Sequence, residues 1–72
     1  MSTNVPVRIT VNGELRIIPE GQSVLGLVQA LGLDPARVAV ELDRRILKRP
    51  FWDESVLSSG AQIEIVQFVG GG

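Results

Sequence analysis

The sequence pattern that most constrains the fold is the alternation of apolar and polar residues in VPVRITV, residues 5–11. A period of two places the four apolar β-branched residues on one face, which is typical of a strand buried on one side only. The pair Asn12-Gly13 follows, and this dipeptide is a strong short-range signal for a β-hairpin. This part of the chain is therefore predicted to form a half-buried strand that turns back on itself.

The length of the hairpin loop decides which side chains of the second strand face the core. The residues concerned are Glu14, Leu15, Arg16, Ile17 and Ile18. A two-residue loop would turn Glu14 and Arg16 toward the core. A three-residue loop over residues 12–14 instead sets Val11 opposite Leu15 and Ile9 opposite Ile17. Because a slip of one residue moves every side chain to the other face, we expect the three-residue, bulged loop, which leaves Ile18 on the solvent face.

The apolar period changes after residue 19 to that of a helix. The positions i, i+3, i+4 and i+7 are occupied by Val24, Leu27, Val28 and Leu31. Ser23 is suited to the N-cap, and Gly32 is suited to the position that follows the last helical turn. We expect one helix of about nine residues, which needs packing against strands to be stable. We interpret Gly26 as a sign that this helix approaches the sheet closely.

Three further strand-like segments follow the helix. They are VAVEL at 38–42, ILK at 46–48 and AQIEIVQF at 61–68. The order strand-strand-helix-strand-strand-strand predicts an α+β fold of the β-grasp kind, a roll in which a mixed sheet of four or five strands packs on one helix. Seventy-two residues are enough for one domain, so we assign residues 1–72 to a single domain whose residues 69–72 form a flexible glycine tail.

The connections between these segments are interpreted as structural. DPAR and DRR are turns, and FWDESVLSSG at 51–60 is a loop with one helical turn at 54–57. We expect Phe51 and Trp52 to cover the core. The densest basic group is interpreted as a solvated surface, with contact to a partner as the alternative: Arg44, Arg45, Lys48 and Arg49.

The last strand carries apolar residues on both faces. Ile63 and Ile65 share the face that we expect to meet the helix, because Glu64 on the opposite face is unsuited to a core. Val66 and Phe68 then lie on the solvent face, where two exposed apolar side chains suggest a docking patch for a partner. The alternative is a strand break after Val66 that returns Phe68 to the edge of the core.

Composition excludes several kinds of site. The chain has no cysteine, no histidine and a net charge of −1, so disulfides, Cys/His metal sites and Ser/His or Cys/His nucleophiles are absent. The charge points neither to nucleic acid nor to an anionic membrane, and no apolar run is long enough to span a bilayer. No signal peptide is visible. We expect a cytoplasmic protein that is monomeric when free and binds no metal or cofactor.

The chain ends in QFVGGG, with three glycines at 70–72. Such a segment has no Cβ atoms and can pass through a narrow channel, which brings the terminal carboxylate to a partner's active site. A carboxylate is a poor acyl donor, but a partner that uses ATP can convert it to a mixed anhydride with AMP. Attack by a sulfur donor then gives a thiocarboxylate, and attack by an amine gives a conjugate. Because the chain has no thiol, any sulfur that it carries must sit on the C-terminal carbon.

Several stretches spread over nearly the whole chain form a joint pattern. They are VNGE at 11–14, PEGQSV at 19–24, LVQALGLDPARVAVEL at 27–42, Trp52, VLSSGAQIEIV at 56–66 and the final FVGGG. In their order, the short length and the glycine terminus, they resemble the ThiS family, the ubiquitin-like β-grasp sulfur carriers of thiamin thiazole biosynthesis. The turn Asp43-Arg44-Arg45 departs from the pattern, since relatives often carry an Asn-Gly-Glu turn there.

The resemblance implies roles for the C-terminal residues. Gly72 would carry the reactive carboxyl, which an E1-like adenylyltransferase activates with ATP and magnesium. Sulfur from a donor such as a cysteine desulfurase would replace one oxygen, and thiazole synthase would accept the thiocarboxylate. Gly71 matches the second glycine of the family's terminal pair, and Gly70 extends it. The residues expected to contact these partners are Val66, Phe68, Val69, Gly70 and Gly71.

Three alternatives share much of this pattern. A sulfur carrier for molybdopterin synthesis has the same fold and terminal glycine pair. A ubiquitin-like protein modifier would use the same activation and then form an amide through Gly72. A plain interaction module would leave the glycines inert.

Overall fold

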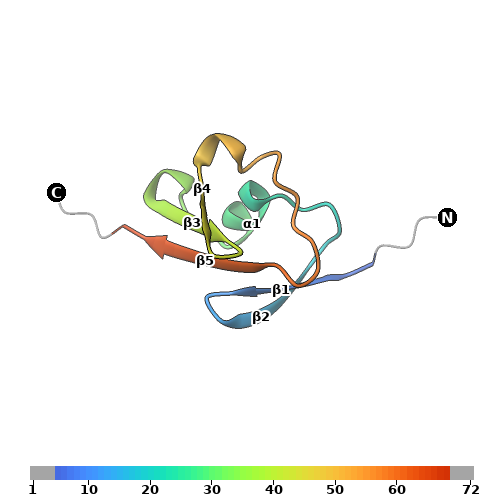
Figure 1. Cartoon of the computed structure of the whole chain (residues 1–72). Helices are drawn as coiled ribbons and strands as arrows, with labels where there is room; N and C mark the ends of the chain where they lie inside the picture. Colours follow the sequence, from blue (N-terminus) through green and yellow to red (C-terminus); the bar gives the residue numbers. More distant parts are fainter. Residues whose placement is uncertain (1–4, 69–72) are drawn as a thin grey trace.

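Five strands form one sheet in the order β2-β1-β5-β3-β4, and the single α-helix covers one face of it (Figure 1). The computed structural model describes residues 5–68. The elements are β1 (Val7–Val11), β2 (Glu14–Ile18), α1 (Val24–Ala30), β3 (Val38–Leu42), β4 (Arg45–Leu47) and β5 (Gln62–Gln67), with short 3₁₀ helices at Pro35–Arg37 and Arg49–Phe51.

The sheet is mixed because two antiparallel hairpins are joined by a parallel pair. β1 pairs with β2 and β3 with β4 in antiparallel hairpins, and β5 lies between the hairpins, parallel to β1 and antiparallel to β3. A parallel pair requires a crossover connection, and here the chain from β1 to β5 contains α1. This arrangement is the β-grasp roll, and it confirms the predicted fold class and the order of the elements.

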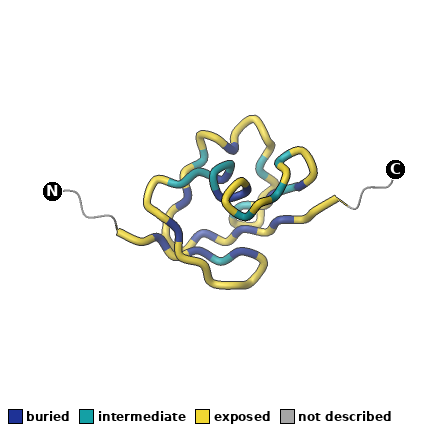
Figure 2. Tube along the Cα trace, turned by 180° about the vertical axis from the view of Figure 1, so that it is seen from behind, coloured by how far each residue is buried: buried dark blue, intermediate teal, exposed yellow. Residues whose placement is uncertain are grey.

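The core lies between the sheet and α1 and consists of apolar side chains. Its most deeply buried members are Trp52, Ile9, Leu27, Ile63, Val24, Val28 and Val40. Figure 2 shows buried and exposed residues alternating along the strands, as expected for a sheet covered on one face. The indole Nε1 of Trp52 donates to the carbonyl oxygen of Leu47 at 2.8 Å, so this ring joins the core without leaving its polar group unpaired.

Both ends of α1 are capped as the sequence predicts. The Ser23 hydroxyl accepts a hydrogen bond from the Gly26 amide at 3.0 Å. After the helix, Gly32 has a φ of +75° and Leu33 donates to the carbonyl of Val28, the geometry of a Schellman cap. These caps satisfy backbone groups of a helix of only seven residues, which cannot persist without its packing on the sheet.

The predicted register of the first hairpin is wrong. Asn12 and Gly13 form a two-residue loop with φ values of 51° and 82°, and Val11 lies opposite Glu14 rather than Leu15. Positive φ at both central residues is typical of a type I′ turn, which Asn-Gly favours strongly and which fits the twist of the flanking strands. Turn chemistry therefore outweighed the hydrophobic pattern.

This register is tolerated because β2 is an edge strand that α1 covers only in part. Leu15 and Ile17 lie on the solvent face with 65% and 61% of their surface exposed, whereas Ile18, expected outside, is 7% exposed. Glu14 and Arg16 lie on the helix side but remain exposed. No charged side chain is therefore forced into the core. The free-energy cost of burying a charge, which argued against this register, does not arise.

Three smaller expectations also need correction. The helical turn predicted at 54–57 lies earlier, as the 3₁₀ helix Arg49–Phe51. Trp52 belongs to the core, but Phe51 is exposed. A Cβ added to Gly26 would meet the side chains of Gln22 and Ser23 at 3.3 and 3.4 Å, so this glycine marks a close approach to the preceding turn and not to the sheet.

The corrected register predicts opposite outcomes for two neighbouring isoleucines. Ile18→Ala should lower the free energy of unfolding by about 2–4 kcal/mol, because it removes buried methylene and methyl groups. Ile17→Ala should change it by less than about 0.5 kcal/mol, because its side chain is exposed. Urea unfolding followed by Trp52 fluorescence measures both values. A larger loss for Ile17→Ala would restore the three-residue loop.

Candidate functional site

The C-terminal end of β5 carries the two described residues of the predicted docking patch. Val66 and Phe68 are 60% and 57% exposed, while Ile63 and Ile65 on the alternate face are buried. The Phe68 amide donates to the carbonyl oxygen of Arg37 at 2.8 Å, which continues the pairing with the chain before β3. The strand therefore does not break after Val66, and the alternative in which Phe68 returns to the core is wrong.

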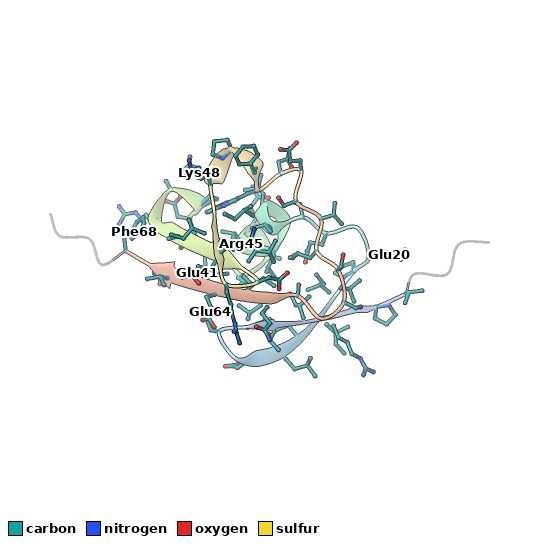
Figure 3. All side chains as sticks on the ribbon, in the orientation of Figure 1. Glu20, Glu41, Arg45, Lys48, Glu64 and Phe68 are labelled. Atoms are coloured by element: carbon teal, nitrogen blue, oxygen red, sulfur yellow. The ribbon has the colours of Figure 1, made fainter. Side chains whose placement is uncertain are left out.

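The other predicted site residues are Val69, Gly70, Gly71 and Gly72, and they lie outside the described residues 5–68. The structure shows instead how the strand that leads to them is held. β5 is the third strand of the five-stranded order, with β1 on one side and β3 on the other. Figure 3 shows Phe68 at the end of β5.

The two sides of β5 are held differently. On the β3 side, five residue pairs run from Val38 opposite Gln67 to Leu42 opposite Ile63. On the β1 side, only Thr10 opposite Gln62 and Val11 opposite Ile63 pair. β1 therefore ends well before β5 does.

Asn12 binds β5 beyond the end of β1. Its backbone amide donates to the carbonyl oxygen of Ile63 at 2.8 Å. Its side-chain Oδ1 accepts from the Ile65 amide at 2.7 Å, and its Nδ2 donates to the Ile65 carbonyl oxygen at 3.2 Å. The carboxamide thus occupies the place of one further strand residue. Together these contacts hold β5 two residues beyond the last parallel pair.

The second hairpin turn has a related contact at the other end of β5. Asp43 and Arg44 form a two-residue turn with φ values of 50° and 71°, so the sequence that departs from the family pattern keeps the same turn geometry. The Asp43 carboxylate accepts from the Gln62 amide at 2.9 Å. Both turns therefore bind the central strand through their first residue. Local sequence patterns predict both only as turns, because contacts across 53 residues from Asn12 and 19 residues from Asp43 have no local signature.

The solvent face of the sheet near the patch is charged. Glu41 on β3 lies directly opposite Glu64 on β5, and Figure 3 shows both along the strands. Ile46 lies opposite Glu41 on β4 and is 77% exposed. Apolar and acidic side chains thus share this face of the sheet.

The basic group is exposed, as expected for a solvated surface: Arg44, Arg45, Lys48 and Arg49. It is not balanced by close ion pairs, since within residues 5–68 the salt bridge found joins Arg37 to Asp34 at 3.7 Å. One member, Arg49, donates to the carbonyl oxygen of Pro35 at 3.5 Å. The structure assigns no partner to the group.

Within the described residues, no three acidic side chains gather in a way that would hold a metal ion. No helix there is long and apolar enough to cross a membrane. The feature that stands out is therefore the strand end itself, with its exposed apolar side chains and its two-sided attachment.

Comparison with known proteins identifies what this arrangement resembles. A sequence model of the ThiS family matches residues 9–72. A crystal structure described as thiamine biosynthesis protein ThiS from Geobacter metallireducens superposes with a TM-score of 0.79 at 32% identity, covering 92% of this chain and all of that one. A solution structure of a thiamine biosynthesis protein from the same organism gives 0.76 at 33% identity, covering 92% of this chain and 88% of the other.

Two curated relatives are named thiazole synthase. The protein of Magnetococcus marinus is 38% identical over 66 residues, and that of Paramagnetospirillum magneticum is 33% identical over 66 residues. Each match covers 92% of this chain but only 20% of the relative. The chain therefore spans about one fifth of the length of these curated relatives.

The Asn12 contacts predict a local effect on β5. Asn12→Gly keeps a residue suited to positive φ and so keeps the turn, but it deletes the side chain. We expect a loss of about 1–2 kcal/mol in unfolding free energy, from two lost hydrogen bonds, and faster amide hydrogen exchange at Ile65.

Asp43→Gly is the matched control for this variant. It makes the same change in the same type of turn but removes a contact at the start of β5, so exchange should rise at Gln62 and not at Ile65. If Asn12→Gly accelerated exchange equally at all core amides, the local attachment of β5 by Asn12 would be disproved.

Proposed function

The chain belongs to the ThiS family, and on this premise we propose that it is a sulfur carrier whose Gly72 carboxylate receives and delivers the sulfur. The observation that carries the proposal is the family match, which extends through the strand end and the glycines to residue 72. The structure supports it by showing β5 anchored on both sides up to Ile65, with exposed residues leading toward those glycines.

The proposed chemistry begins at a poor acyl donor. An E1-like adenylyltransferase would use ATP and magnesium to join the Gly72 carboxylate to AMP, which makes the carbonyl carbon electrophilic. The persulfide of a sulfur donor such as a cysteine desulfurase would then attack that carbon, with loss of AMP, to form an acyl disulfide. A thiol reductant would cleave the S–S bond of this acyl disulfide, leaving a thiocarboxylate. The chain has neither cysteine nor histidine. It therefore acts in this proposal as a protein cosubstrate, and the partner enzymes bind the nucleotide and metal.

We propose thiazole synthase as the acceptor of the thiocarboxylate, which places the chain in thiamin biosynthesis. Support comes from the two relatives named thiazole synthase, each of which contains a segment similar to this chain. A carrier-like segment within such proteins is consistent with carrier and synthase acting on each other. The two relatives named thiazole synthase give no such support to the molybdopterin pathway.

The partner-binding residues have separate parts in this proposal. Val66 and Phe68 present apolar surface next to the point where the chain leaves the sheet, and burying a side chain of that size contributes about 1.5–3 kcal/mol to binding. Val69, Gly70 and Gly71 then lead to the reactive carboxyl. The lack of side chains in Gly70 and Gly71 suits a channel in which a partner contacts mainly the backbone.

Intact mass spectrometry tests the proposed chemistry. Incubated with an E1-like activating enzyme, ATP, magnesium and a sulfur donor, the chain should gain the mass expected when one oxygen is replaced by sulfur. The variant that lacks Gly72 should fold normally and gain nothing. Adducts of higher mass with amines would favour a protein modifier, and sulfur gained by the variant without Gly72 would show that the reactive carboxyl is assigned to the wrong residue.

Phe68→Asp tests the docking patch. We expect the KM of the chain in adenylation to rise by about tenfold or more, because an apolar contact is lost and a charge is placed at the interface. The unfolding free energy should change by less than about 1 kcal/mol, since the position is exposed. Ile17→Asp is the control, with similar exposure at the far edge of the same face. Equal effects of the two variants on KM would refute a specific patch at Phe68.

A further inference from the structure

The backbone of Gln67 lies at an open edge in the middle of the sheet. Along β5, the amides and carbonyls alternate between its two neighbours. The carbonyl of Ile63 and both the amide and the carbonyl of Ile65 point toward the β1 side, where Asn12 binds them. The Phe68 amide points toward the β3 side. By this alternation the N–H and C=O of Gln67 point toward the β1 side. Within residues 5–68, the β1–β5 pairing ends at Ile63 and Gln67 is paired only with Val38 on the β3 side. No hydrogen bond outside the strand ladders reaches the Gln67 N–H or C=O there.

A groove lies next to this open edge on the helix side of the sheet. It has a volume of about 300 Å³ and is lined by Val11, Asn12, Glu14, Arg16, Leu31, Leu33, Ile65 and Gln67. Four of its lining residues are apolar, and β2 contributes one acidic and one basic side chain. The two-residue turn of the first hairpin accounts for these two charged side chains, because it places Glu14 and Arg16 on the helix side.

We propose that an extended segment of the activating enzyme pairs with β5 at Gln67 and places an apolar side chain in this groove. Unpaired backbone donors and acceptors on a strand edge are satisfied by another extended backbone. A residue that pairs directly with Gln67 has its side chain on the same face of the sheet, in either strand direction. Gln67 lines the groove, so the paired residue enters it as well.

The length of the tail supports the enzyme as the occupant. This step rests on the proposed function, in which the Gly72 carboxyl reaches the enzyme's catalytic centre. Residues 69–72 span at most about 14 Å when fully extended. The enzyme surface around its catalytic centre must therefore lie within that distance of Phe68, which brings it against the end of β5 and the open edge.

This pairing and the Phe68 patch would hold β5 from different directions. Phe68 and Val66 offer side chains on the solvent face of the sheet, whereas Gln67 offers its backbone in the plane of the sheet and a groove on the helix side. The inferred contact fixes the strand direction at Gln67, the last residue of β5. It is thus a recognition site distinct from the apolar patch.

Gln67→Pro tests the pairing, because it removes the partner-facing N–H and no hydrogen bond found within residues 5–68. We expect the KM for adenylation to rise by about tenfold, the effect of losing one hydrogen bond and introducing a ring at the contact. Gln67→Ala removes the same side chain but keeps the N–H, so its KM should stay several-fold below that of Gln67→Pro. If Gln67→Pro had the wild-type KM, or if Gln67→Ala were equally impaired, the proposal would be overturned.

A synthetic chain in which an ester oxygen replaces the Gln67 N–H covers the case in which the proline variant fails to fold. It deletes the same donor without restricting φ, and it should show the same increase in KM. An ester chain with the wild-type KM would overturn the proposal.

Amide hydrogen exchange separates this inference from the proposed function. On mixing the wild-type chain with the E1-like enzyme, the Gln67 amide should become protected. Adenylation without this protection would overturn the inference and leave the proposed function intact. Protection without adenylation would support the inference and argue against the proposed function. If the Gln67 amide were protected in the free chain and the chain formed dimers in solution, the open edge would pair with a second copy. That result would overturn the proposal that the enzyme pairs there.

Discussion

The parallel contact between β1 and β5 is the interaction on which the rest of the structure depends. It joins the β1–β2 hairpin to the strands β3–β5, which would otherwise be two separate antiparallel units. Only two residue pairs form it, Thr10 with Gln62 and Val11 with Ile63. The backbone and side chain of Asn12 extend it by three hydrogen bonds. Asn12, a loop residue, thus extends the contact between β1 and β5 without lengthening β1.

Stabilisation by a few contacts of this kind suits the small size of the chain. A domain of 72 residues buries a smaller fraction of its surface than a larger domain does, so each core residue contributes much of the stability. The core therefore relies on apolar side chains and one tryptophan whose indole is hydrogen-bonded. Caps and turn contacts satisfy the backbone at the ends of short elements. The strand before the terminal glycines, β5, is thus bound by β1, by β3 and by the first residue of both hairpin turns.

The first hairpin shows how two local signals compete. Alternation of apolar residues favoured a three-residue loop, and the Asn-Gly pair favoured two residues. The turn prevailed because an edge strand can expose its charged residues whichever face they occupy. The same outcome exposes Leu15 and Ile17, buries Ile18, and lines a groove with Glu14 and Arg16. A rule that fails locally in this way often marks a surface with another use, and here the groove borders the end of β5.

The sequence by itself determined the order of the elements, the caps of α1, the inward face of Ile63 and Ile65, and the outward face of Val66 and Phe68. Each follows from a local period or a local cap, which short-range sterics and burial decide. The tertiary structure alone decided the register of β2 and the contacts of Asn12 with Ile65 and Asp43 with Gln62. It also decided the open edge at Gln67. These depend on where one strand ends beside another that is distant in the sequence, and no local pattern encodes that difference in length.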